Sequence, residues 1–131
     1  MRIEVNLLSG QQLKATFAGH EIISDQSIDA GGGAEHPEPF DYFLSSMPLC
    51  AAFYMRKFCQ QRDIDTTGLT LSQEVITPDE QNPYKKKILM NVSLPNNFPK
   101  KYEKAILASA NTCTVKKVIQ AMPEFEIQVV K

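Results

Sequence analysis

The sequence predicts a single α+β domain over residues 1–131, with antiparallel sheets around a long buried helix. Three observations support this fold class. Segments in which apolar and polar residues alternate come in blocks, separated by helical segments, which is typical of antiparallel sheets. One long stretch is apolar on nearly every helical face. The length of 131 residues fits one domain. The expected order of elements is βββ-α-ββ-α-α-β.

Three short strands are predicted first. Apolar residues alternate over 3–7, a turn signal covers 9–12, and the alternation resumes over 13–17, so these segments predict a hairpin. A third strand follows from His20 to Asp25. The glycines and prolines of residues 26–39 then predict a loop.

A helix is predicted from about Phe40 to about Arg62. Pro39 and Asp41 favour its start, since proline suits the first turn and an acid stabilises the positive end of the helix dipole. Pro48 lies in its middle and predicts a kink. Because the helix is apolar all round, we expect it to be buried, as the central helix of a core or of a dimer.

The remaining segments predict a second hairpin, two helices and a last strand. The hairpin strands cover residues 69–75 and 88–94. A helix follows from about Lys100 to Ala110, and after a break rich in capping residues a short helix ends at Pro123. The alternation of Phe125, Ile127 and Val129 predicts the last strand. These segments complete the α+β order.

Composition and charge exclude several function classes. Lys and Arg number 14 against 15 Asp and Glu, so the net charge of −1 gives no support to a nucleic-acid or membrane surface. No apolar run approaches the roughly 20 residues of a membrane span. The first residues alternate and include an acid, so we expect no signal peptide and a cytoplasmic protein with reduced thiols. No His, Cys, Asp and Glu cluster has zinc-like spacing, so we expect no metal and no cofactor.

Three cysteines carry the candidate chemistry. Cys59 lies nine residues after Cys50, on the opposite side of a straight helix, which leaves Cys113 as the only other candidate partner of Cys50. Cys113 begins a helix with Lys116 and Lys117 nearby, so we expect a lowered pKa and a reactive thiolate. Each cysteine could instead be a small buried hydrophobe, the interpretation we keep for Cys59.

Several motifs together resemble the OsmC/Ohr family of osmotically inducible and organic hydroperoxide resistance proteins. Gly19-His20, Asp25 and Gly31-Gly32-Gly33 precede the segment Pro39–Cys50, which is similar to the family's helix ending in a cysteine. Cys113-Thr114-Val115 is similar to the second signature, Cys-Pro-Val, although a threonine stands where the family has proline. The two cysteines lie 63 residues apart, as in the family. The resemblance covers nearly the whole chain.

The resemblance implies an intertwined homodimer with active sites at the subunit interface. It also implies a thiol peroxidase that acts in oxidative-stress defence. In this reaction Cys50 attacks an organic or inorganic peroxide, Cys113 traps the sulfenic acid as a disulfide, and a dithiol reductant restores both thiols. Apolar residues near Cys50 would favour a hydrophobic peroxide; they include Met47, Leu49, Phe53 and Tyr54.

The same resemblance implies an acid and an arginine that activate the first cysteine. Asp41 stands at the position of the family's glutamate, with Glu38 nearby as an alternative. No arginine matches, and Lys14 or His20 would be the substitutes for its charge. His20 and Glu38 are also expected at the substrate pocket. Two other functions stay open on the same fold: a binding module for a small lipophilic or thiol-bearing molecule, and a redox-sensing or purely structural dimer.

Overall fold

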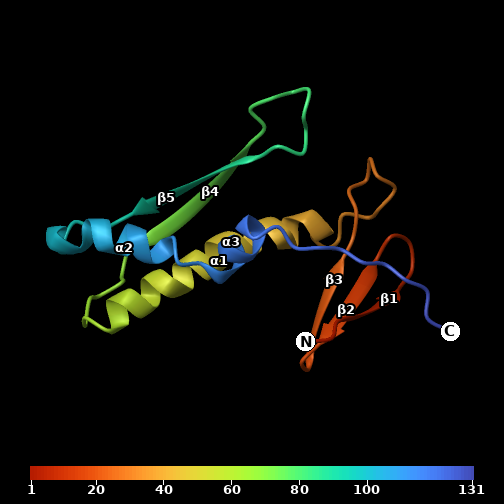
Figure 1. The fold of residues 1–131 in the computed structure, drawn as a ribbon, viewed down its shortest axis with the longest axis horizontal. Helices are drawn as coiled ribbons and strands as arrows, with labels where there is room; N and C mark the ends of the chain where they lie inside the picture. Colours follow the sequence, from red (N-terminus) through yellow and green to blue (C-terminus); the bar gives the residue numbers. More distant parts are fainter. The chain divides into compact units, whose positions relative to one another are not determined.

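The helices and strands follow the predicted order as far as the last helix (Figure 1). The computed structural model describes all residues, 1–131. The elements are β1 (Glu4–Leu7), β2 (Leu13–Phe17), β3 (His20–Ser24), α1 (Pro39–Gln60), β4 (Thr70–Ile76), β5 (Lys87–Ser93), the 3-10 helix η1 (Lys100–Tyr102), α2 (Glu103–Ala110) and α3 (Thr114–Gln120). The chain divides into two units, Met1–Ser45 and Ser46–Lys131.

The first unit contains an antiparallel sheet in the order β1-β2-β3. Val5 pairs with Ala15, which pairs with Ile22, so these three side chains share one face. Together with Pro39 and Tyr42 from the start of α1, this face borders a hollow of about 260 Å³. The Tyr42 hydroxyl donates a hydrogen bond of 2.7 Å to the carbonyl of Ile23 and ties the helix start to β3.

A buried carboxylate organises the loop between β3 and α1. Asp25 is 1% exposed and accepts hydrogen bonds from the backbone N–H groups of Gln26 (2.7 Å), Glu35 (3.1 Å) and Gly33 (3.4 Å). A Cβ on Gly32 would lie 2.2 Å from the carbonyl oxygen of Gln26. The glycine run is therefore needed for the close approach of the loop backbone to Asp25.

Helix α1 runs through Pro48 without interruption. Its buried residues recur at helical spacing and form one face: Met47, Ala51, Met55, Phe58 and Cys59. Leu49 and Phe53 are 70% and 59% exposed. The expectation that the helix is buried all round is therefore wrong for the single chain, because within this chain only one face is buried. No helix of the protein combines the length and apolarity that crossing a membrane requires.

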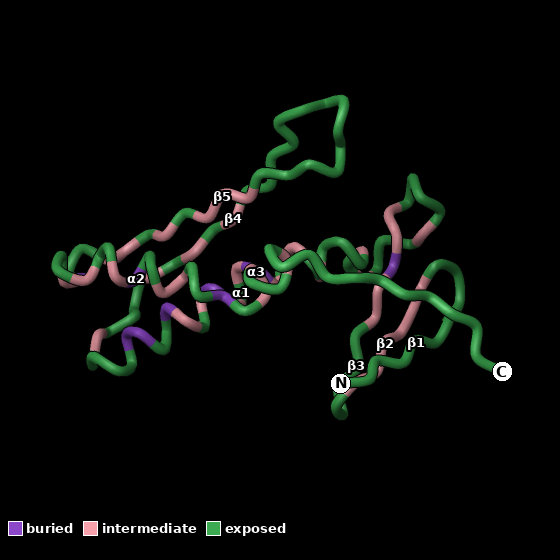
Figure 2. The backbone as a smooth tube through the Cα atoms, viewed as in Figure 1, coloured by how far each residue is buried: buried purple, intermediate pink, exposed green.

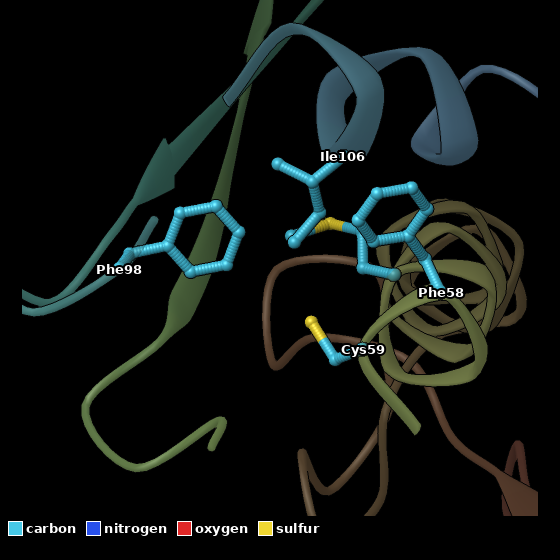
Figure 3. Packing of buried hydrophobic residues seen from close by; sticks show 5 residues of the cluster. Phe58, Cys59, Phe98 and Ile106 are labelled. Atoms are coloured by element: carbon cyan, nitrogen blue, oxygen red, sulfur yellow. The ribbon is translucent and has the colours of Figure 1, made fainter. Parts of the chain in front are cut away.

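The core of the second unit lies between α1, α2 and the β4–β5 hairpin (Figure 3). It is made of Met55, Phe58, Cys59, Phe98 and Ile106, and apolar residues of both hairpin strands pack against it. The β4–β5 register places Leu71 opposite Val92, and both side chains contact this core. Every buried apolar side chain of the protein belongs to this unit.

The predicted last strand is not formed. Residues 123–131 belong to no helix or strand, and Figure 2 shows the segment exposed along its length. Phe125 and Ile127 are 89% and 97% exposed. A strand needs a neighbour for its backbone N–H and C=O groups, and no other strand of this chain pairs with the segment. The apolar residues of this segment alternate as in a strand, but within the single chain the segment pairs with no sheet.

Candidate functional site

The structure brings Cys50 and Cys113 together. Cys50 lies on α1, and Cys113 is the residue that caps the start of α3. Both are free thiols, and Cys113 donates a side-chain hydrogen bond to the sulfur of Cys50. Cys50 is partly exposed, whereas Cys113 is 1% exposed. The two cysteines therefore form a reduced pair with one accessible and one buried sulfur.

Hydrogen bonds make Cys50 the more acidic thiol of the pair. Burial raises the pKa of Cys50, but the backbone N–H of Val115, the Cys113 thiol and the backbone N–H of Thr114 together lower it further than burial raises it. No lysine or arginine of this chain contributes to the lowering. The thiolate is the nucleophilic form of cysteine, so the site favours Cys50 as the nucleophile.

The pKa of Cys113 is raised, contrary to the sequence expectation. Burial is the largest cause, and the neighbouring Cys50 raises it further, while the N–H of Lys116 lowers it in part. That N–H donates to the Cys113 sulfur at 3.5 Å, and the carbonyl of Met47 is a second acceptor for the thiol hydrogen at 3.9 Å. The expected helix-terminal effect exists, but the first N–H groups of α3 also act on Cys50, which lies across from the cap.

A second link holds α3 to α1 beside the cysteines. The hydroxyl of Tyr54 and that of Thr114 form a hydrogen bond of 2.8 Å. Tyr54 lies one helical turn after Cys50, and Thr114 directly follows Cys113. The Tyr54 ring also meets Phe53 edge-on, with ring centroids 5.4 Å apart. The link therefore joins the two helices one residue away from Cys113 on α3 and one turn away from Cys50 on α1.

An apolar cavity of about 430 Å³ reaches the pair from the side of Cys113. Of the predicted pocket residues, Met47 lines it, and His20, Glu38, Phe53 and Tyr54 do not. Cys50 is not part of its lining either. The β4–β5 hairpin, α2 and α3 supply most of the wall: Leu71, Ile88, Met90, Val92, Leu107, Ala110, Asn111, Lys116, Ile119 and Gln120. Lys116 donates a hydrogen bond of 2.6 Å to the Asn111 side chain, so one polar patch interrupts the apolar lining.

The other predicted site residues lie in the first unit and have local roles there. Asp41 is exposed and accepts a hydrogen bond from the backbone N–H of Glu38 at 2.9 Å, which secures the start of α1. Glu38 in turn accepts from the N–H of Ser27 at 3.0 Å. His20 is exposed and lies against the Phe17 ring, with ring centroids 6.2 Å apart. Lys14 forms an ion pair of 3.4 Å with Glu21. No three metal-ligating side chains are grouped in the chain.

Cys59 is a core residue, as expected from its place on the helix. It is fully buried, and burial raises the pKa of its thiol, with the charge of Arg62 opposing in part. Arg62 packs over the Phe58 ring at 3.8 Å and donates to the Phe58 carbonyl at 3.1 Å. The thiol therefore packs as a small hydrophobe beside a capped helix end, apart from the cysteine pair.

Sequence reasoning missed two features of the site: the N–H donors to Cys50 and the link between Tyr54 and Thr114. The break before α3 did predict a helix start at Cys113. The sequence therefore indicated N–H donors at this helix start, but we expected them to lower the pKa of Cys113, whereas it is the pKa of Cys50 that is lowered. No pattern pairs a tyrosine with a threonine 60 positions later.

The fold and the cysteine pair define a small α+β protein with a dithiol site. A family model described as OsmC-like protein matches residues 31–128. The chain therefore belongs to the OsmC-like family, and the resemblance seen in the sequence is confirmed at the level of the family. None of the curated proteins matches this chain.

Several solved structures share the fold of this chain. One from Psychrobacter arcticus, described as an osmotic stress induced and detoxification response protein, is 21% identical, with a TM-score of 0.69 over 88% of this chain and 85% of that chain. The organic hydroperoxide resistance protein OsmC of Legionella pneumophila is 14% identical, with a TM-score of 0.62 over 92% and 90%. An OsmC-like protein from Mycoplasma pneumoniae is 15% identical, with a TM-score of 0.64 over 92% and 87%. At these identities the likeness establishes the fold.

Proposed function

We propose that this protein is a thiol-dependent peroxidase that reduces organic or inorganic hydroperoxides through Cys50 and Cys113. The observation that carries the proposal is the hydrogen bond from the Cys113 thiol to Cys50, whose pKa is lowered. A peroxidase of this kind needs one accessible thiolate and one protonated thiol within reach of it. In support, Cys50 on α1 is partly exposed with a lowered pKa, and Cys113 at the start of α3 is buried with a raised pKa. Membership of the OsmC-like family adds weight, because a solved relative by fold is described as an organic hydroperoxide resistance protein.

In the first step the Cys50 thiolate attacks one peroxide oxygen. A sulfur–oxygen bond forms and the oxygen–oxygen bond breaks, so two electrons pass from sulfur to the peroxide. The leaving alkoxide takes a proton from solvent and departs as an alcohol, or as water when the substrate is hydrogen peroxide. Cys50 is left as a sulfenic acid. Its partial exposure lets a peroxide approach, which the burial of Cys59 does not allow.

In the second step Cys113 resolves the sulfenic acid. Its sulfur attacks that of Cys50, the hydroxyl leaves as water with the thiol proton, and a disulfide forms. The Cys113 side chain already interacts with that of Cys50. A dithiol reductant then exchanges with the disulfide, returns both cysteines to thiols and leaves as its own disulfide. The cycle needs no metal or cofactor.

The first-unit residues enter the proposal through the resemblance. Asp41 is proposed as the acid that assists the reaction, with Glu38 as the alternative. Replacing Asp41 with asparagine keeps an acceptor for the Glu38 N–H and removes the charge. A fall of about a hundredfold in the peroxide rate would support a direct role, since positioned acid–base groups contribute at least that much. An unchanged rate would assign Asp41 to the helix start alone.

We propose further that the working form is a homodimer whose subunits cover the exposed apolar faces. The first unit has a three-stranded sheet but no buried apolar side chain, so it lacks a core of its own. Leu49 and Phe53 lie exposed on α1, and residues 123–131 carry exposed alternating apolar residues. A second copy of the same chain could cover these surfaces, because each copy carries an uncovered sheet, an exposed apolar face of α1 and an unpaired apolar segment. An intertwined arrangement is also what the family resemblance implies.

A steady-state assay tests the proposed activity. The full chain, a dithiol reductant and cumene hydroperoxide are mixed, and peroxide loss is followed. We expect turnover that Cys50→Ser abolishes and Cys59→Ala retains. Turnover that survives in Cys50→Ser at the wild-type rate would reject Cys50 as the reacting thiol.

A second candidate function rests on the cavity. It is mostly apolar, holds about 430 Å³ and borders Cys113 rather than Cys50, so it could hold a small lipophilic molecule without any reaction at Cys50. Native mass spectrometry of purified protein would detect such a ligand. Retention of the ligand in Cys50→Ser, together with an inert wild type in the peroxide assay, would favour binding over catalysis.

A further inference from the structure

Tyr54 and Thr114 are joined by a hydrogen bond for which neither the family match nor the proposed cysteine chemistry gives a reason. The Tyr54 hydroxyl meets the Thr114 hydroxyl at 2.8 Å. Thr114 is the first residue of α3 and stands next to Cys113 in the chain. Tyr54 is one turn beyond Cys50 on α1. The hydrogen bond therefore joins the two segments that carry the two sulfurs.

The start of α3 also meets α1 through contacts of the two sulfurs. The carbonyl of Met47 lies 3.9 Å from the Cys113 sulfur, a long contact for a thiol donor. The Cys113 thiol also donates to Cys50, and the N–H groups of Thr114 and Val115 point at the same sulfur. These are sulfur hydrogen bonds, and they depend on where the first turn of α3 sits. The hydrogen bond between the Tyr54 and Thr114 hydroxyls, in contrast, is short at 2.8 Å and joins two oxygen atoms.

We propose that Tyr54 is a positioning residue for the cysteine pair, whose hydroxyl holds Thr114 and so keeps Cys113 and the first N–H groups of α3 on the sulfur of Cys50. The inference rests on the proposed function, because the cysteine pair is the reacting group of the proposed peroxidase. Tyr54 itself touches neither sulfur and is not a catalytic residue. The sequence departs from the family's Cys-Pro-Val at this point, and a proline there would have no hydroxyl for the tyrosine.

The proposal predicts which side-chain atoms matter. Tyr54→Phe and Thr114→Val each remove one hydroxyl and keep most of the shape. Thr114→Ser keeps the hydroxyl and loses only a methyl group. Tyr84→Phe removes a hydroxyl from a residue that is 92% exposed in the β4–β5 loop and serves as the matched control. A single hydrogen bond changes an equilibrium by about two- to tenfold, so effects of that size are expected.

The test is the pH dependence of alkylation by iodoacetamide, measured for each cysteine by peptide mass mapping of the full chain. In Tyr54→Phe and Thr114→Val we expect the midpoint for Cys50 to move to higher pH, with about two- to tenfold slower alkylation at neutral pH. Thr114→Ser and Tyr84→Phe should match the wild type. The double variant should be no slower than either single variant, because both remove the same bond.

The opposite results overturn the proposal. It fails if Cys50 alkylation keeps its wild-type midpoint in folded Tyr54→Phe and Thr114→Val. It also fails if these variants speed alkylation of buried Cys59, since that pattern means general loosening of the core rather than loss of position. No peroxide is used, so the measurement stands apart from the proposed activity. A wild type inert to peroxide with a shifted Tyr54→Phe profile would reject the peroxidase and keep the positioning role.

Discussion

Cys113 donates its thiol hydrogen to the sulfur of Cys50, and this one bond acts on the two pKa values in opposite directions. It lowers the pKa of Cys50 and raises that of Cys113. Burial raises both pKa values. At Cys50 the hydrogen bonds from Cys113 and from the N–H groups of Val115 and Thr114 outweigh the effect of burial, whereas at Cys113 burial prevails. The structure therefore orders the pair: as pH rises, Cys50 loses its proton first and Cys113 second. The proposed reaction needs this order.

The peroxide reaction of Cys50 should persist to pH values below the ordinary pKa of a cysteine. Because the pKa of Cys50 is lowered, its thiolate forms at a lower pH than that of an ordinary cysteine, and the rate should fall as pH drops through that lowered pKa. Single-turnover peroxide reduction at a series of pH values measures this profile. Cys59→Ala is the control and should leave the midpoint in place. A midpoint at or above that of a free cysteine would contradict the assignment.

Replacing Cys113 should change the acidity of Cys50 as well as the fate of its sulfenic acid. Cys113→Ala removes the donor, so the midpoint for Cys50 should rise. Cys113→Ser retains a hydroxyl donor, so the rise should be smaller. Neither variant can form the disulfide, and the sulfenic acid should persist long enough for trapping with dimedone. Equal midpoints for wild type and Cys113→Ala would contradict the hydrogen bond.

Gly32→Ala should destabilise the first unit by about 1–3 kcal/mol, the usual range for a clash that forces backbone to shift. The new Cβ would lie 2.2 Å from the carbonyl oxygen of Gln26. Gly33→Ala is the matched control, because its Cβ has no neighbour closer than 3.4 Å. Chemical denaturation of both variants measures the difference. Equal stabilities would mean that the loop does not close on Asp25 as described.

Phe53→Glu should dissociate the proposed dimer. Phe53 is 59% exposed on α1, and a carboxylate there would be buried against a second copy without a partner. Sedimentation velocity should give a dimer for the wild type and a monomer for the variant. Gln60→Glu introduces the same charge at an exposed position of the same helix and should stay dimeric. A monomeric wild type would reject the dimer, and with it the second copy as the cover of these faces.

Patterns within one segment carried most of the fold prediction. The period of two in β1–β3 and in the hairpin, and the apolar run of α1, gave the elements and their order because each depends on neighbouring residues alone. The alternation at Phe125, Ile127 and Val129 is equally clear, yet no strand forms. A strand depends on a pairing partner, which a local pattern does not contain.

The candidate site was predictable only in part for the same reason. The motifs around Cys50 and Cys113 indicated a pair, and the structure places them in contact. The expectation of a low pKa for Cys113 was wrong, because the direction depends on burial and on which sulfur the first N–H groups of α3 reach. The contribution of Tyr54 comes from a tertiary contact with Thr114 and has no counterpart in sequence spacing.

Thiol mapping after a single equivalent of an organic hydroperoxide tests the central claim most directly. Free thiols are counted, and disulfides are located by peptide mass mapping, before and after treatment of the wild type and of Cys50→Ser. We expect rapid, stoichiometric loss of two thiols as a disulfide between Cys50 and Cys113, with Cys59 left free and no reaction in the variant. Three thiols that persist in the wild type, or a disulfide that includes Cys59, would contradict the account.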